Sequence, residues 1–338
     1  MKRYGNLFEA AFTRENLHAA YLQARRGKRA KRACFQFEKY LGTNLERLHR
    51  EIHDGSYRPK PYFPFEVYEP KPRLIYAPSF CDLVVQHAIY KIAGPIFDKG
   101  FIDQSYACRI GMGTHKAADY AQHALQQIPC DTYVLKLDIR KFFYRIDRGV
   151  LRMLIERKVK DRRFADLMMQ FAEYGEPIGI PIGNLLSQLY ALIYLNPLDH
   201  FIKRVLKVRR YCRYVDDFVL FGLTHATALM MKARIVEFLA SLKLELSRWT
   251  LARAKRGVNF VGYRTWAGKR FIRKRSIYNF RRALRRGALE SMVSILGHAK
   301  RTHSLQHLLR TVSERSYAFF RRLPEIYRCP GHARAAPA

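Results

Sequence analysis

Hydrophobic and polar residues follow two different periods along this chain of 338 residues, and each period predicts its own kind of element. The helical period prevails in the first 60 residues, where we expect one helix around residues 16–22 and another that ends near residues 54–55. A cationic run over residues 25–32, RRGKRAKR, separates them. The proline-rich segment 59–72 breaks the helical period and therefore predicts extended chain and a β-hairpin.

The clearest strand pattern is TYVLKLDIRKFF, residues 132–143, in which the residues alternate with period two. One face carries Tyr133, Leu135, Leu137 and Ile139, and the other carries Val134, Lys136 and Asp138. Asp138 is therefore expected on the polar face of a strand.

The remaining elements alternate between the two periods. Helices are expected over residues 83–97, 185–195 and 224–242, and in a polar, solvent-facing insert near 148–174. Two more are expected from their caps: one begins at Thr114, and one begins at Asn196 with Pro197 in its first turn and runs through Val205. Strands are expected over 213–222 as a pair joined at Asp216-Asp217, near 244–246, and over 258–266 as a pair, before a basic, mostly helical tail over 271–338. The mixture predicts an α+β fold.

The charge balance adds a partner to this picture. The chain has 62 Lys and Arg residues against 28 Asp and Glu residues, which gives a formal net charge of +34. An excess spread along the whole chain favours a long polyanion, and nucleic acid is the commonest one. The candidates for RNA contact in the cationic run are Arg25, Arg26, Lys28, Arg29, Lys31 and Arg32, although a solvated charge run on a helix is an equally good interpretation. With no signal peptide and no apolar run of membrane-spanning length, we expect a cytoplasmic protein without a membrane partner.

Two adjacent carboxylates, Asp216 and Asp217, lie inside the apolar stretch RYVDDFVL, where like charges repel and lose solvation unless a positive charge compensates them. Asp138, on another predicted strand, supplies a third carboxylate. Such a set suits two divalent hard cations about 3.5–4 Å apart, which assist phosphoryl transfer through positioning and charge neutralisation. Taken alone, the Asp216-Asp217 pair is also compatible with an exposed turn.

The ordered motifs resemble those of the reverse transcriptases over most of the chain. The Tyr-x-Asp-Asp box is YVDD (214–217), LDIRKFF (137–143) and GIPIGNLLSQ (179–188) precede it, and FVGY (260–263) follows it as a primer-grip-like motif. KPRLIYAPSFCDLVVQHAI (71–89) resembles the finger motif that contacts a nucleotide triphosphate, and YACRIGMGTHKAA (106–118) resembles a block of the group II intron enzymes.

This resemblance implies a fold and a set of roles. The fold is the right-hand polymerase fold, with an N-terminal extension and fingers in 1–131, a palm with an antiparallel sheet in 132–270 that holds a finger insert near 148–174, and a helical basic thumb in 271–338. The cofactors are two Mg²⁺ ions, replaceable by Mn²⁺, held by Asp138, Asp216, Asp217 and the backbone carbonyl of Ile139. The dNTP substrate is contacted by Lys71, Arg73, Phe143, Ile182, Gly183 and Gln188. Phe143 takes the steric-gate position that excludes a ribose 2′-hydroxyl, and Phe260, Gly262 and Tyr263 form the primer grip. From the residues alone, Phe143 as a core residue and Lys71 as a solvated turn residue remain open.

Two departures point to a subfamily. Pro181-Ile182-Gly183 stands where most reverse transcriptases have Pro-Gln-Gly, and the side chain of Ile182 forms no hydrogen bond. The block ends in Ser187-Gln188, where group II intron enzymes have Ser-Pro. Both features are similar to the reverse transcriptases of diversity-generating retroelements, bacterial or phage-encoded enzymes that copy a template-repeat RNA into cDNA with frequent errors at adenines, for mutagenic retrohoming. A neutral packing change at Ile182 is the alternative.

The resemblance further implies an RNA template with an RNA or DNA primer, an RNA/cDNA duplex as product, and a small basic accessory protein that forms a ring. A retron-like or abortive-infection-type antiviral reverse transcriptase is an alternative, and a catalytically silent RNA-binding scaffold is the alternative that is not an enzyme. One motif is incomplete, since Thr250 stands near the place of a lysine that assists the leaving pyrophosphate, with Arg248 and Arg253 as nearby substitutes.

Overall fold

Helices and antiparallel strands share the chain in the computed structural model, which describes residues 2–68, 72–315 and 317–327. A first unit consists of Met1–Arg109, Asp138–Val208 and Lys232–Arg248, and a second unit consists of Ile110–Leu137, Arg209–Met231 and Trp249–Ala338. Three elements have residues in both units: β3 (Tyr133–Ile139), α11 (His225–Ser241) and β6 (Leu246–Arg253).

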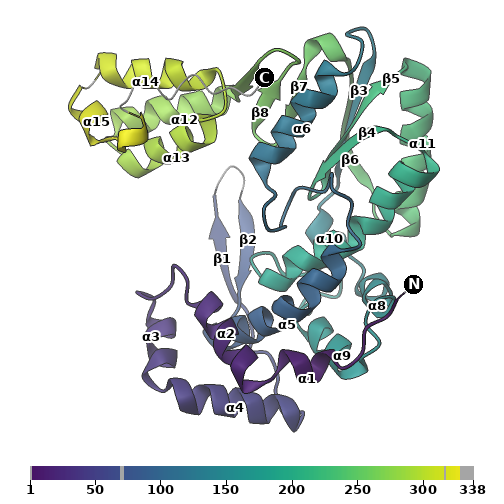
Figure 1. Cartoon of the computed structure of the whole chain (residues 1–338), viewed down its shortest axis with the longest axis vertical. Helices are drawn as coiled ribbons and strands as arrows, with labels where there is room; N and C mark the ends of the chain where they lie inside the picture. The colour runs from purple at the N-terminus through teal and green to yellow at the C-terminus, as the bar shows by residue number, and fades with distance from the viewer. Residues whose placement is uncertain (1, 69–71, 316, 328–338) are drawn as a thin grey trace. The chain divides into compact units, whose positions relative to one another are not determined.

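The first unit is mostly helical (Figure 1). Its helices are α1 (Leu7–Ala11), α2 (Arg14–Ala24), α3 (Arg32–Lys39), α4 (Leu41–His53), α5 (Phe80–Asp98), α7 (Phe142–Arg145), α8 (Arg148–Glu156), α9 (Arg162–Gln170), α10 (Leu185–His200) and the π-helical η1 (Phe201–Val205). Its strands β1 (Phe63–Val67) and β2 (Arg73–Ala77) form an antiparallel hairpin. The apolar helix α5 begins at Ser79, whose side chain caps it, and it packs against α2 and α10.

The structure corrects two expectations about these helices. The insert near 148–174 is not simply polar and solvent-facing, because α8 and α9 each bury an apolar face that includes Leu151 and Phe164. Asn196-Pro197 does not start a new helix, because α10 continues through Pro197 to His200. Leu195 and Leu198 on either side of this proline are fully buried, and their packing outweighs the hydrogen bond that proline removes from a helix.

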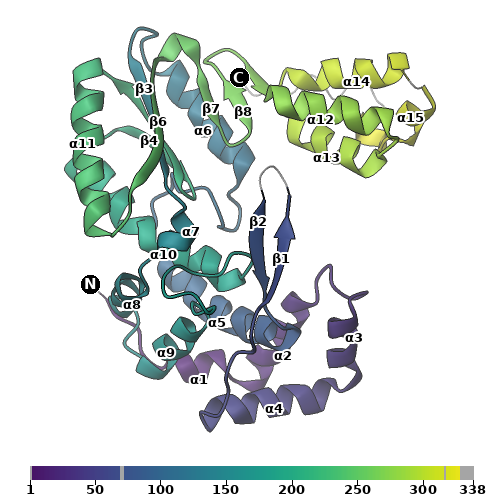
Figure 2. The ribbon, with the colours of Figure 1, turned by 180° about the vertical axis from the view of Figure 1, so that it is seen from behind.

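The second unit combines strands with helices. Its remaining elements are α6 (Thr114–Gln126), β4 (Arg210–Tyr214), β5 (Asp217–Leu223), η2 (Ala254–Arg256), β7 (Val258–Phe260), β8 (Tyr263–Thr265), β9 (Arg270–Ile272), α12 (Lys274–Arg285), α13 (Leu289–Ala299), α14 (Ser304–Arg315), α15 (Tyr317–Arg322) and η3 (Glu325–Tyr327). Strands β4, β5, β3 and β6 follow one another in a four-stranded sheet, and β7, β8 and β9 form an antiparallel three-stranded one. Helix α6 packs against β4 and β5, and Figure 2 shows the same sheet from behind.

Most of the predicted strands are confirmed. Residues 213–222 form two antiparallel strands that meet at the Asp pair, and 258–266 form a second hairpin. The strand expected near 244–246 instead begins at Leu246 and extends to Arg253, and the cap position of α6 is Gly113, one residue before the predicted Thr114. The α+β class with antiparallel sheets, as in the right-hand polymerase fold, is confirmed.

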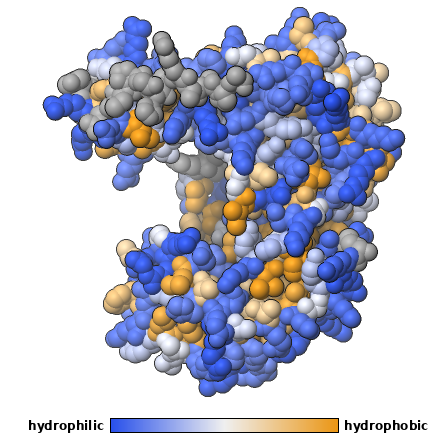
Figure 3. Space-filling view, in the orientation of Figure 1, coloured by the Kyte–Doolittle hydropathy of each residue, from blue (hydrophilic) through white to orange (hydrophobic). Residues whose placement is uncertain are grey.

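Hydrophilic residues cover most of the face of the molecule in Figure 3. On the face shown in Figure 3, hydrophobic residues form separate patches among hydrophilic ones. Within the described part of the chain, no helix is both long and apolar enough to span a membrane.

Candidate functional site

The Asp pair lies at a tight and strained turn. In the β4–β5 hairpin Tyr214 pairs with Asp217, so Val215 and Asp216 alone form the connection. Val215 has a φ of 56°, a left-handed conformation that costs a β-branched residue about 1–3 kcal/mol. Arg213 is fully buried and donates a hydrogen bond from Nη1 to the Val215 carbonyl at 2.9 Å. The buried guanidinium therefore helps to hold the turn that presents Asp216 and Asp217.

Asp217 has a cationic neighbour. The Lys136 ammonium on β3 lies 2.9 Å from Asp217 Oδ2, and each side chain is 22% exposed. This ion pair supplies the compensating positive charge that two adjacent carboxylates require. The sequence placed Lys136 on the polar face of β3 but gave no indication of its partner.

Asp138 has a hydroxyl partner in the first unit. Ser247, at the start of β6, donates a hydrogen bond from Oγ to Asp138 Oδ2 at 2.6 Å, and the same Oγ lies 3.3 Å from the Asp138 carbonyl. This bond restricts the rotation of the Asp138 carboxylate, which is partly exposed and keeps further lone pairs for other ligands. Ser247 carried no signal in the sequence.

The donor atoms of this region suit hard cations. Carboxylate oxygens are the ligands that Mg²⁺ prefers in proteins, and the ammonium of Lys136 already marks a place for positive charge beside Asp217. No group of three or more His, Cys, Asp or Glu side chains in the described residues is close enough to hold a metal ion. The strand order places β3 between β5 and β6.

The predicted nucleotide contacts of the first unit lie on two segments that are joined directly. Tyr76 on β2 donates its backbone N–H to the Ile182 carbonyl at 2.7 Å. Gly183 has a φ of 101°, and a Cβ there would lie 2.5 Å from Cγ2 of Ile75. The β1–β2 hairpin, which carries the exposed Arg73, is therefore fixed to the loop 179–184.

The two adjacent phenylalanines of the LDIRKFF motif have different environments. Phe142 is 2% exposed and belongs to the core, whereas Phe143 is only half-buried. The carbonyl of Phe143 accepts a hydrogen bond from the N–H of Ile180 at 2.9 Å, which joins this residue to the same loop. The structure thus brings Phe143, Ile182 and Gly183 together with β2.

The other predicted nucleotide contacts are less defined. Gln188 is exposed on α10, and Lys71 lies outside the described residues. Asn184, which the motif did not single out, caps α10 and donates from Nδ2 to the hydroxyl of Tyr62 at 2.5 Å and to the carbonyl of Phe171 at 3.2 Å. This buried amide fixes the C-terminal end of the loop.

The primer-grip-like motif forms the turn between β7 and β8. The side chains of Phe260 and Tyr263 are buried, at 1% and 0% exposure, whereas Val261 and Gly262 are half-buried. Any contact of this motif with a ligand in solution must therefore use mainly the backbone of the turn. Thr250 is exposed on β6.

The cationic run connects α2 to α3 and ends with Arg32, the first residue of α3. Arg25 is engaged internally, since it donates to the Tyr21 hydroxyl at 2.7 Å and lies 3.4 Å from Glu38. The other predicted RNA contacts of the run are exposed: Arg26, Lys28, Arg29, Lys31 and Arg32.

Comparisons with known proteins agree with these motifs. The family model described as reverse transcriptase (RNA-dependent DNA polymerase) matches residues 59–265, more than half of the chain. Protein YkfC of Escherichia coli (strain K12) is 26% identical over 290 residues, which cover 70% of this chain and 74% of YkfC. Group II intron-encoded protein LtrA of Lactococcus lactis subsp. cremoris is 28% identical over 170 residues, 47% of this chain but only 28% of LtrA.

A solved structure of telomerase from Candida albicans, in complex with a TWJ fragment of telomeric RNA, is also similar. Its TM-score is 0.49 at 13% identity, over 84% of this chain and 59% of that one. A similarity of this size supports no conclusion by itself.

Proposed function

The chain belongs to the reverse transcriptase (RNA-dependent DNA polymerase) family, and from this membership we propose that it copies an RNA template into DNA at Asp138, Asp216 and Asp217. The observation that carries the proposal is the strained Val215–Asp216 turn, which the family match encloses and the buried Arg213 supports. Strain of this kind persists where the surrounding structure imposes it, and it is concentrated at functional sites.

In this proposal Asp138, Asp216 and Asp217 would hold two Mg²⁺ ions, with the Ile139 carbonyl as a further ligand, although the described residues contain no group of three such side chains arranged to hold a metal. When bound, such ions neutralise the charge that develops on the attacking and leaving oxygens during phosphoryl transfer. Ser247 orients the Asp138 carboxylate, and Lys136 balances the charge of Asp217 before the substrate arrives. The protein supplies position and charge, so no side-chain nucleophile is required.

The proposed dNTP site uses the joined segments of the first unit. Arg73 contacts the triphosphate, Phe143 excludes the ribose 2′-hydroxyl, and Ile182 and Gly183 line the place of the incoming base. The attachment of β2 to the loop 179–184 supports this grouping, since a ligand at one segment meets the other.

We assign the chain further to the diversity-generating retroelement type, on Ile182 and the Ser187-Gln188 ending of its motif. Its template is then a template-repeat RNA, its product an adenine-mutagenised cDNA, and its partner a small basic accessory protein. Without a hydrogen-bonding side chain at position 182, selection of the base relies more on shape, which discriminates by only about 1–3 kcal/mol.

Sequencing of primer-extension products tests this assignment. Products of the wild-type chain on a defined RNA template should carry errors concentrated at template adenines. Ile182→Gln should lower the adenine error rate severalfold, whereas Ile182→Val, which keeps an apolar side chain, should leave it unchanged. Equal error rates in all three proteins would show that Ile182 does not affect the selection of the base. Template-independent synthesis by the wild type would favour an antiviral reverse transcriptase instead.

A further inference from the structure

The turn between β7 and β8 repeats the strain of the turn that carries Asp216. Val261 has a φ of 42°, so a β-branched residue again takes the left-handed conformation at a hairpin tip. Gly262 follows with a φ of 91°, and Phe260 pairs with Tyr263 across the turn. A turn of this kind needs support from outside the hairpin.

Helix α13 provides this support through His298. The imidazole stacks on the ring of Tyr263, with centroids 4.3 Å apart and an interplanar angle of 19°. It also fills the space next to Gly262, because a Cβ on this glycine would lie 2.9 Å from Cε1 and Nε2 of His298. The His298 side chain thus restricts the conformations open to Gly262 and to the neighbouring Tyr263.

Hydrogen bonds fix the same arrangement. The Tyr263 hydroxyl donates to the His298 carbonyl at 2.8 Å, and it lies 3.0 Å from Nδ1 of His298 and 3.2 Å from Nδ1 of His115 on α6. Burial raises the pKa of Tyr263 to about 12 and lowers the pKa of His298, so Tyr263 keeps its proton at neutral pH. On the other side, the Arg273 N–H donates to the Gly262 carbonyl at 3.3 Å.

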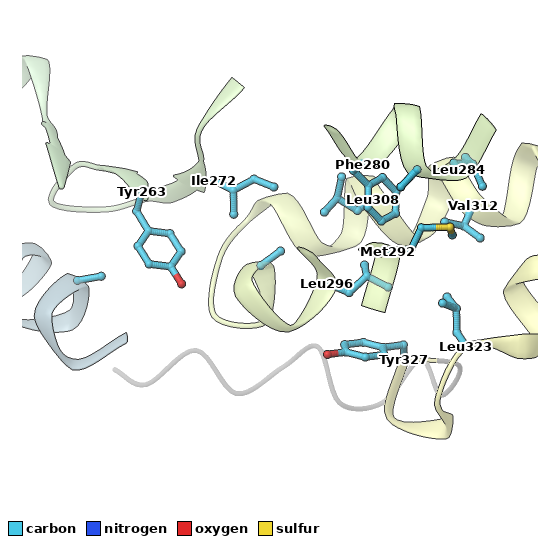
Figure 4. Packing of buried hydrophobic residues seen from close by; sticks show 13 residues of the cluster. Tyr263, Ile272, Phe280, Leu284, Met292, Leu296, Leu308, Val312, Leu323 and Tyr327 are labelled. Atoms are coloured by element: carbon cyan, nitrogen blue, oxygen red, sulfur yellow. The ribbon is translucent and has the colours of Figure 1, made fainter. Parts of the chain in front are cut away.

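The contact belongs to a larger buried cluster. Figure 4 shows Tyr263 and Ile272 in the same cluster as Met292, Leu296 and other residues of the C-terminal helices. Since Tyr263 and these partners are almost completely buried, a change in α13 is transmitted to the turn through packed atoms.

We propose that His298 is a positioning residue that sets the conformation of the Val261–Gly262 turn and thereby places the primer end for nucleotide addition. This inference rests on the proposed function, because it gives the turn a primer to position. His298 acts through Gly262 and Tyr263 and is not itself a catalytic residue.

The test compares His298→Ala with Val312→Ala, which truncates a fully buried residue of the cluster that Figure 4 shows well away from Tyr263. His298→Ala should slow single-turnover primer extension about tenfold or more, since small misplacements of reacting groups have large effects on rate. The dissociation constant for the RNA–primer duplex should stay within about twofold, because the turn positions a duplex that other surfaces bind. His298→Phe keeps the stacked ring and should retain most of the extension rate.

Gly262→Ala adds a geometric test. Alone it should slow extension, since its Cβ meets the imidazole. In the His298→Ala background its additional effect should be smaller, because the clash with the imidazole is removed and only the backbone strain of alanine at a φ of 91° remains. Additive effects of the two substitutions would overturn the inference.

Amide hydrogen exchange separates this inference from the proposed function. His298→Ala should accelerate exchange over residues 258–265, and Val312→Ala should do so much less. Unchanged exchange in this segment, or equal loss of extension in both variants, would overturn the role of His298. If the wild-type chain extends no primer, the proposed function fails, and the exchange measurement still decides whether His298 holds the turn.

Discussion

A hydrogen bond and an ion pair contribute to the positions of two carboxylates of the candidate site, Asp138 and Asp217. Ser247 Oγ donates to Asp138, and the Lys136 ammonium lies beside Asp217. A carboxylate that is already oriented loses less freedom when it binds a metal ion. The groups that hydrogen-bond to such a carboxylate therefore affect the affinity of the site for the metal.

Ser247→Ala tests this role at the residue scale. Without the hydroxyl, Asp138 loses its orientation, and primer extension should fall about 10–100-fold with a higher Mg²⁺ concentration needed for half-maximal rate. Ser241→Ala is the matched control, since the Ser241 hydroxyl donates to the Phe238 carbonyl within α11, one turn earlier in the same helix. An unchanged Mg²⁺ dependence in Ser247→Ala would contradict the role.

The sequence singles out the acidic residues of the candidate site, and their role as metal ligands stays a prediction, but it does not indicate their partners. Asp138, Asp216 and Asp217 stand out because carboxylates are rare between buried apolar residues. Ser247 is more than one hundred positions from Asp138 in the chain, so only the pairing of strands reveals their contact. Arg213 lies in a predicted strand, but neither its complete burial nor its hydrogen bond to the Val215 carbonyl could be predicted from the sequence.

At the scale of elements, the loop 179–184 and the β1–β2 hairpin behave as one assembly. Their junction has little spare room, because Gly183 faces Ile75 and Tyr76 donates its backbone N–H to Ile182. The geometry of the proposed dNTP site therefore depends on the absence of a side chain at Gly183.

Gly183→Ala should disturb this junction. Its Cβ would lie 2.5 Å from Ile75, and its φ of 101° is unfavourable for alanine, so we expect a loss of about 1–3 kcal/mol in stability and a raised KM for dNTPs. Gly42→Ala in α4 is the control, because a Cβ there meets no atom within 4 Å. If Gly183→Ala and Gly42→Ala had the same KM for dNTPs and the same thermal midpoint, the proposed dependence of the dNTP site on this junction would be wrong.

Element prediction succeeded where periodicity reflects burial on one face. The alternation over 132–143 and the hairpin at the Asp pair are both present. It failed where packing overrides a local signal, as at Pro197, or where a polar-looking segment hides one apolar face, as in α8 and α9. The finger, palm and thumb boundaries stay predictions.

For the whole molecule, charge is the dominant property. A net charge of +34 over 338 residues predicts binding to RNA that weakens steeply as salt rises, since released counterions drive the association.

The exposed residues of the run 25–32 should account for a measurable part of the salt dependence of RNA affinity. Replacing Lys28, Arg29 and Lys31 by Ala should make the slope of log K against log salt about 2–3 units less steep. The control replaces Arg14, Arg152 and Arg310, which lose the same charge but already pair with carboxylates. Equal slopes for the two triple variants would mean that the run does not contact RNA.

The central claim is that the chain is a polymerase whose reaction depends on its Asp set. The most direct measurement is the rate of DNA primer extension on an RNA template with Mg²⁺ and dNTPs, with RNA binding measured in parallel, for the wild type, Asp216→Asn and the exposed control Asp131→Asn. We predict extension by the wild type and the control, and at least about a 100-fold slower rate for Asp216→Asn at unchanged RNA affinity. Equal rates for Asp216→Asn and the wild type, or RNA binding without extension in all three proteins, would contradict the account.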